Sequence, residues 1–119
     1  MKAFKVAFLG RKRIPESRAA EYKMIDVLCQ TIREHERVEI YLGSGSFFDD
    51  VCRLAVSMTI KRAGTERVTI LPARTYPLKK RFLSLAKRAD LVFAFALPDE
   101  DAAEAVRLAE DLGKAVVYL

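Results

Sequence analysis

Three short polar segments of the sequence carry residue types suited to binding an anion, and each follows an apolar run. The first begins Gly10-Arg11-Lys12-Arg13, so that three consecutive cations follow a glycine. Glycine at the end of a strand permits a positive φ or a close approach to a ligand, and arginine and lysine both bind phosphate. We therefore expect Gly10, Arg11 and Lys12 to bind a phosphate; the alternative is a solvated run of charges.

The second segment is rich in glycine and serine and leads directly into a predicted helix. It reads Gly43-Ser44-Gly45-Ser46, and Asp49 follows three residues later. Small residues leave backbone N–H groups exposed beside a helix N-terminus, an arrangement that binds anions. The serines can also cap the helix while Asp49 complements the helix dipole, and both roles can hold together. The spacing matches neither a P-loop nor a dinucleotide-binding fingerprint.

The third segment supplies Arg74 and Tyr76 after another apolar run. Arginine suits bidentate contact with a phosphate, and tyrosine can stack on a base, so we add both residues to the predicted site. Lys79-Lys80-Arg81 then fall in the first turn of a helix, where cations oppose the dipole. This placement indicates that an anion or an acidic partner compensates them; the alternative is a cluster of surface charges.

A fourth segment, centred on Asp99, is acidic and contains no glycine. Its carboxylates are expected to stabilise the N-terminus of the last helix. Asp99 and Glu104 are the candidates for a catalytic acid or base, and no nucleophile–base pair is recognisable. His35 is expected to be exposed and not catalytic. Since this histidine is single and the cysteines have no ligand spacing, we predict no metal site and no disulfide framework.

The elements that must position these segments follow from the apolar runs. Several runs are continuous and rich in β-branched and aromatic residues, which is typical of strands buried on both faces. The predicted strands are Phe4–Leu9, Val38–Leu42, Arg67–Leu71, Asp90–Ala96 and Ala115–Leu119. Helical segments separate them, and this alternation predicts a parallel sheet with helices on both sides.

Helical periodicity supports this alternation. Two apolar stripes with helical spacing are formed by Ile25, Leu28, Cys29 and Ile32 and by Phe48, Val51, Cys52, Ala55 and Thr59. Gly64 and Gly113 follow the second and fourth helices, where a left-handed C-terminal cap is expected. Pro77 precedes a third predicted helix, Leu78–Arg88, and Pro98 precedes the fourth.

The length and the net charge of the chain limit its domain number, its fold class and its possible partners. The 119 residues predict one domain, residues 1–119: a Rossmann-like, doubly wound α/β fold with a five-stranded, mainly parallel sheet. The strand order stays open. A net charge of +5 admits nucleic acid as a partner without requiring it. The longest apolar run is far shorter than the about 18 residues of a spanning helix. With no signal-peptide core after Met1, we expect a cytoplasmic protein without a membrane partner.

Taken together, these segments resemble the SLOG superfamily of Rossmann-like domains. That group includes the lonely-guy phosphoribohydrolases, molybdenum-cofactor carrier proteins, DprA and small bacterial proteins with a Gly-His-Arg signature. On the pattern of the small members, Gly43, Phe48 and Asp49 match, and Ser44 and Phe47 replace glycines. The first basic segment stands where Gly-His-Arg stands. The resemblance implies a nucleotide or nucleotide-derived ligand whose phosphate lies against the first two segments.

Two other functions are carried as alternatives. The lonely-guy enzymes hold phosphate with a glycine-rich loop that supplies a catalytic glutamate; here only Pro98 and Glu104 correspond, and the glycines are absent. This kinship suggests a nucleotide N-glycosidase or phosphoribohydrolase. The basic segments, with DprA as the analogy, suggest a nucleic-acid-binding module. No cofactor beyond a nucleotide-type ligand is implied.

We also expect a homodimer or higher homo-oligomer. A small sheet leaves edges that proteins cover or pair, and relatives of the lonely-guy type are commonly dimers. Val56, Met58 and Ile60 lie beyond the main stripe of the second predicted helix and are the candidate contact residues. The alternative is that these three residues belong to the core.

Overall fold

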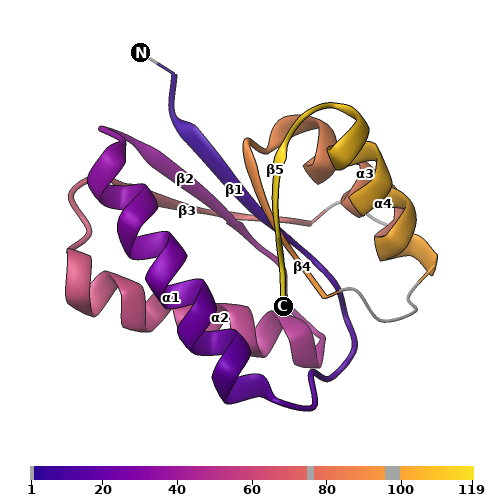
Figure 1. Ribbon diagram of the computed structural model, residues 1–119, viewed down its shortest axis with the longest axis horizontal. Coiled ribbons are helices and arrows are strands. Elements are labelled where there is room, and N and C mark those ends of the chain that lie inside the picture. Colours follow the sequence, from indigo (N-terminus) through magenta and orange to yellow (C-terminus); the bar gives the residue numbers. More distant parts are fainter. Residues whose placement is uncertain (1, 75–76, 96–99) are drawn as a thin grey trace.

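The computed structural model describes residues 2–74, 77–95 and 100–119 (Figure 1). Strands and helices alternate along the chain, which confirms the α/β class predicted from the apolar runs. The elements in chain order are β1 (Phe4–Leu9), α1 (Ser17–Glu34), β2 (Val38–Leu42), α2 (Phe47–Ala63), β3 (Val68–Pro72), α3 (Leu78–Arg88), β4 (Leu91–Ala94), α4 (Glu100–Asp111) and β5 (Ala115–Tyr118).

The predicted strands differ from the observed ones only at their ends. β3 begins at Val68 and not at Arg67, and it ends at Pro72 and not at Leu71. The Arg67 carbonyl nevertheless accepts a hydrogen bond from a backbone N–H of β2 (2.8 Å). β4 begins at Leu91 and not at Asp90, whose carboxylate accepts a hydrogen bond from the backbone N–H of Lys5 in β1 (2.8 Å). The predicted end of this strand, Ala96, lies outside the described residues. β5 ends one residue before its predicted end.

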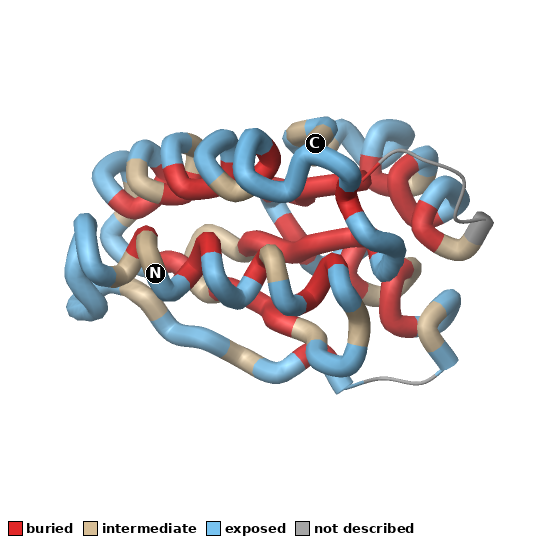
Figure 2. The backbone as a smooth tube through the Cα atoms, turned by 90° about the horizontal axis from the view of Figure 1, so that it is seen from below, coloured by how far each residue is buried: buried red, intermediate tan, exposed pale blue. Residues whose placement is uncertain are grey.

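The five strands form one parallel sheet with the order β3-β2-β1-β4-β5. This order answers the question that the sequence leaves open. As predicted, helices cover both faces: α1 and α2 pack together on one face and α3 and α4 on the other (Figure 1, Figure 2). The chain reverses its direction across the sheet between β1 and β4, and ligands of such sheets bind outside the strand carboxyl ends at this point.

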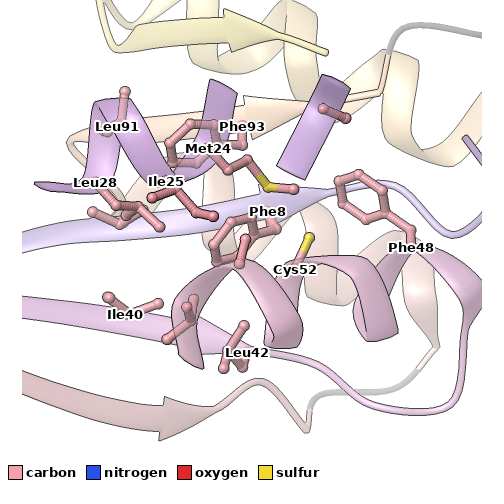
Figure 3. Close-up of a cluster of buried hydrophobic side chains, with 14 of the residues drawn as sticks. Phe8, Met24, Ile25, Leu28, Ile40, Leu42, Phe48, Cys52, Leu91 and Phe93 are labelled. Atoms are coloured by element: carbon pink, nitrogen blue, oxygen red, sulfur yellow. The ribbon is translucent and has the colours of Figure 1, made fainter. Parts of the chain in front are cut away.

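The two faces of the sheet are packed differently. Large side chains fill the space beneath α1 and α2, where Phe8 and Phe93 stack with ring centroids 5.3 Å apart and Met24 and Leu28 are fully buried (Figure 3). Small residues dominate the other side. There the buried alanines are Ala7, Ala73, Ala86, Ala89, Ala94, Ala102, Ala105 and Ala109.

The glycines at the ends of α2 and α4 have the positive φ that the sequence predicts, although Gly64, with ψ 172°, lies outside the left-handed helical region. Gly64 (φ 84°) and Gly113 (φ 74°) both have positive φ, and the Gly64 N–H donates to the Ile60 carbonyl at 2.8 Å. The predicted helical stripes are buried as well, apart from Cys29 and Val51, which are half-buried. Within the described part of the chain, no helix has the length and apolar character needed to span a membrane.

Candidate functional site

The loops that follow β1 and β2 lie side by side at the carboxyl edge of the sheet. If Gly10 carried a Cβ, that atom would lie 3.0 Å from the Phe48 ring of α2. In the same region, the Arg13 guanidinium carbon lies 4.5 Å from the centroid of the Phe47 ring. These two contacts join the first loop to the beginning of α2, so the predicted adjacency of the two segments is present.

These contacts also revise the reason for a glycine at position 10. Among the described glycines, positive φ occurs at Gly45, Gly64 and Gly113 and not at Gly10. The close approach at Gly10 is made by the Phe48 ring, which stacks in turn with Phe95. A packing requirement therefore explains this glycine without a ligand. Arg11 and Lys12, which follow it, are exposed.

The loop after β2 combines an exposed turn with a capped helix. Gly45 has φ 95° and is exposed, as is Ser44. Ser46 is the N-cap of α2, and its Oγ accepts a hydrogen bond from the Asp49 N–H at 3.0 Å. The predicted capping role of Ser46 is thus present. This role uses the Asp49 N–H but leaves the exposed turn before it available to a ligand.

Beneath this loop lies a buried charged pair, Asp49 of α2 and Arg81 of α3. Their exposed fractions are 8% and 4%. A Cβ on Gly43 would lie 2.8 Å from Asp49 Oδ1 and 3.0 Å from Arg81 Nη1, so both side chains meet at this glycine. The expectation that an acidic partner compensates the cations of this turn therefore holds at Arg81, and the alternative of a cluster of surface charges does not hold for this residue. Arg81 reaches from the α3 side of the sheet to the beginning of α2, over the end of β2.

Burial dominates the electrostatics of this pair. Desolvation raises the pKa of the Asp49 carboxyl above its ordinary value of 3.8, and hydrogen bonding with Ser46 and the charges of Arg81 and Arg53 oppose that rise. A buried carboxyl with a raised pKa beside a specific charge partner is a common mark of a functional site, and ion pairs that only support a fold produce it too. Here the carboxyl faces protein groups, so Asp49 supports the loop from within.

Arg53 is a residue of this edge that the sequence interpretation missed. Its Nη2 donates a hydrogen bond to the Gly43 carbonyl at 2.6 Å. Arg53 lies four residues after Asp49, and this spacing places both side chains on the same side of α2. That spacing is the signal that could have identified it.

The remaining residues predicted for binding or catalysis are Arg74, Tyr76, Asp99 and Glu104. Arg74 is exposed after β3 and shares a hollow with Ser44. Tyr76 and Asp99 lie outside the described residues. Glu104 is on α4, where its carboxylate pairs with Lys79 of α3 at 3.1 Å. Lys79 thus has an acidic partner, as its position at a helix N-terminus indicates.

Neither cysteine is in a disulfide, and Cys52 is deeply buried. Burial raises the pKa of the Cys52 thiol well above 9.0, so this thiol is unreactive at neutral pH.

The prediction that His35 is exposed is wrong in part, because the imidazole ring is half-buried and stacks on the Phe4 ring, with the two ring centroids 3.9 Å apart. Its Nδ1 lies 2.9 Å from the Thr31 carbonyl oxygen.

The structure alters which residues are candidates for self-association. Val56 is buried and belongs to the core, and Met58 and Ile60 are half-buried and pack against it. The alternative core interpretation is therefore correct for Val56. The exposed large apolar residues of the α1–α2 layer are instead Tyr22, Phe47 and Leu54.

Hollows occur at both edges of the sheet. One of about 240 Å³ lies at the carboxyl edge between α2 and the end of β3. A larger one, of about 920 Å³, lies between the C-terminal halves of α1 and α2. The larger hollow contains none of the loops that follow the strands, so the smaller one bears more directly on the predicted site.

No protein-family model matches this chain, and the search of curated proteins found no match either.

Proposed function

We propose that this protein binds a nucleotide or a nucleotide-derived ligand, whose phosphate lies against the loops that follow β1 and β2. The observation that carries the proposal is the side-by-side arrangement of these loops. Arg11 and Lys12 lie in one of them, and the other precedes the N-terminus of α2. A helix N-terminus carries a partial positive charge and backbone N–H donors, and both favour a phosphate.

The loop after β2 is suited to this role because its shape is fixed from below. Ser46 caps α2, the Asp49–Arg81 pair fills the space beneath Gly43, and Arg53 holds the Gly43 carbonyl. A preformed loop loses little conformational entropy when a ligand binds. The exposed Ser44 and Gly45 then contribute a hydroxyl and backbone N–H groups.

Kinship with the SLOG superfamily is part of this proposal and rests on the sequence resemblance. It adds the expectation of a nucleotide-type ligand over a simple anion. The hydrolase alternative has less support, because the one described acid/base candidate, Glu104, is paired with Lys79 between α3 and α4. Nucleic-acid binding rests only on the basic character of the edge.

The test of the site is the double variant Arg11→Ala, Lys12→Ala. Each residue would contribute a charge-assisted hydrogen bond, so we expect nucleotide affinity to fall by more than about tenfold. The matched control is Arg33→Ala, Arg37→Ala, which removes the same charge from exposed residues at the amino edge. Calorimetric titration of a nucleoside monophosphate into each protein measures the difference. Equal affinities of the wild type and the Arg11/Lys12 variant would refute the site.

Self-association is the second part of the proposal, and its surface is the outer side of α2. Phe47 and Leu54 are exposed there, with Asp50 near the beginning of the helix and Lys61 near its end. Antiparallel packing of two α2 helices would bring the acidic end of one copy against the basic end of the other. Light scattering on the wild type and Leu54→Lys tests this arrangement. A dimer that Leu54→Lys dissociates supports it, and a monomeric wild type at micromolar concentration refutes it.

A further inference from the structure

The hollow at the end of β3 differs in composition from three other hollows of the described surface. It is lined by Arg53 of α2, Arg74 after β3 and Ser44 after β2, together with apolar residues of β2 and β3. Its described lining includes two arginines and no carboxylate. Three other hollows of the described surface each contain two carboxylates among their cations. Of these four hollows, the one at the end of β3 has the least compensated positive charge.

The position of Arg53 in this hollow is fixed by the protein. Its Nη2 donates to the Gly43 carbonyl at 2.6 Å, and a guanidinium retains further N–H donors after one such bond. The charge of Arg53 also acts on Asp49, but that carboxyl is buried beside Arg81 and does not line the hollow. Arg53 is thus held in place with donors left for a ligand.

Arg74 is the second arginine that lines this hollow. It is exposed, and it follows Ala73, whose N–H donates to the Leu42 carbonyl at 2.9 Å. That bond attaches the beginning of the loop to the end of β2. The apolar wall includes Ile70, which is 44% exposed although it lies in a strand. Two arginines therefore face a hollow whose remaining surface is mostly aliphatic.

We infer that this hollow is an anion-binding site, and that its ligand is a small phosphate ester or inorganic phosphate. Arginine is suited to phosphate because its planar fork makes two parallel hydrogen bonds. The volume of about 240 Å³ equals about eight water molecules at roughly 30 Å³ each. That is below the about 300–1,000 Å³ of sites that enclose a drug-sized ligand, so the site takes a phosphoryl group with a short organic portion.

This site lies beside the proposed nucleotide site and shares Ser44 with it, and Arg53 also holds the Gly43 carbonyl in the loop of that site. Arg74, which the sequence predicts for the phosphate site, lines this hollow. Arg11 and Lys12 follow β1, whereas Arg53 and Arg74 lie beside the edge strand β3. The inference therefore does not depend on nucleotide binding at the first loop, and either site can fail while the other holds.

The experiment is a titration of inorganic pyrophosphate into the ¹⁵N-labelled full chain, followed by NMR at constant low ionic strength. The amides of Ile70, Leu71 and Ala73 report on the hollow, and the amide of Arg11 reports on the first loop. We expect saturable shifts at the three hollow amides. Arg53→Gln and Arg74→Gln should each weaken this binding by about tenfold, because each removes a charge-assisted hydrogen bond.

The matched control is Arg67→Gln, which removes the same charge at the other end of β3 and should leave the affinity within about twofold. Arg74→Gln keeps the test decisive if Arg53→Gln disturbs the loop through its bond to Gly43. Arg11→Ala, Lys12→Ala should leave the hollow shifts intact. Shifts that do not saturate, that survive Arg74→Gln, or that disappear in the Arg11/Lys12 variant would each overturn the inference.

Discussion

Asp49 and Arg81 come from helices on opposite faces of the sheet and meet at the end of β2, where a Cβ on Gly43 would lie 2.8 Å from Asp49 Oδ1 and 3.0 Å from Arg81 Nη1. Both side chains are buried. A charge removed from water is tolerated only when it is paired and hydrogen-bonded. The loop after β2 therefore rests on a charged pair that links the α2 and α3 layers, and this loop is the one on which the proposed ligand depends.

The first prediction concerns Gly43→Ala. The added methyl group would collide with two buried side chains that have little room to move, so we expect a loss of about 1–3 kcal/mol in the free energy of unfolding. Urea denaturation measures this loss. Ser44→Ala is the matched control, because the neighbouring residue is exposed and its change should stay within about 0.5 kcal/mol. If the two variants are equally stable, Asp49 and Arg81 do not meet at Gly43.

The second prediction concerns the coupling of the pair. Arg81→Met leaves the Asp49 carboxyl buried without its main positive neighbour and should cost about 3 kcal/mol. In Asp49→Asn combined with Arg81→Met neither charge remains, so the double variant should be at least about 1 kcal/mol more stable than the sum of the single changes predicts. A double-mutant cycle by chemical denaturation measures this coupling, and strict additivity would contradict it.

The third prediction concerns pH. Because burial raises the pKa of folded Asp49 above 3.8, the folded protein binds more protons than the unfolded chain between 3.8 and the raised value. The contribution of Asp49 to stability therefore falls as pH rises through this window and is constant below it. Relative to Asp49→Asn, the wild type should lose stability across the window. Denaturation of both proteins over a pH series measures the difference; a difference that grows in favour of the wild type would mean a lowered pKa.

The fourth prediction concerns the contact between the first two loops. The Arg13 guanidinium over the Phe47 ring should contribute about 0.5–1 kcal/mol, since the site is exposed. Arg13→Gln and Phe47→Leu should each lose this interaction, and the double variant should lose little more than either single variant. Thermal denaturation of the four proteins gives the coupling. Independent effects of the two substitutions would show that this contact does not join the loops.

Periodicity and residue type predict the fold of this chain in detail. The bounds of β1, β2 and α3 are as expected, because Gly10 and Gly43 follow the two strands and Pro77 precedes the helix. Strand order could not be predicted, since the helical connections permit more than one arrangement. The sequence also does not show which strands lie at the edges of the sheet, because the edge strand β3 is apolar although its Ile70 is 44% exposed.

The site was predicted less completely, for a physical reason. A run such as Lys79-Lys80-Arg81 does not reveal which cation turns inward. The signal was present, because Leu78, Arg81, Phe82 and Leu85 have the spacing of one helical stripe, and Arg81 lies on it. At position 10, the glycine was assigned to a ligand, although the Phe48 ring accounts for it. Pairs formed across the sheet depend on tertiary packing and cannot be read from one segment.

The most direct test of the central claim is a thermal-shift measurement at low salt on the wild-type chain. The ligands are nucleoside mono-, di- and triphosphates, NAD, ADP-ribose and inorganic phosphate. A ligand at about 100 times its dissociation constant adds about 2.7 kcal/mol, which for a domain of this size raises Tm by about 10 °C. We predict such a shift with one class of nucleotide and a much smaller one with phosphate alone. The absence of a shift with every nucleotide would contradict the proposed function.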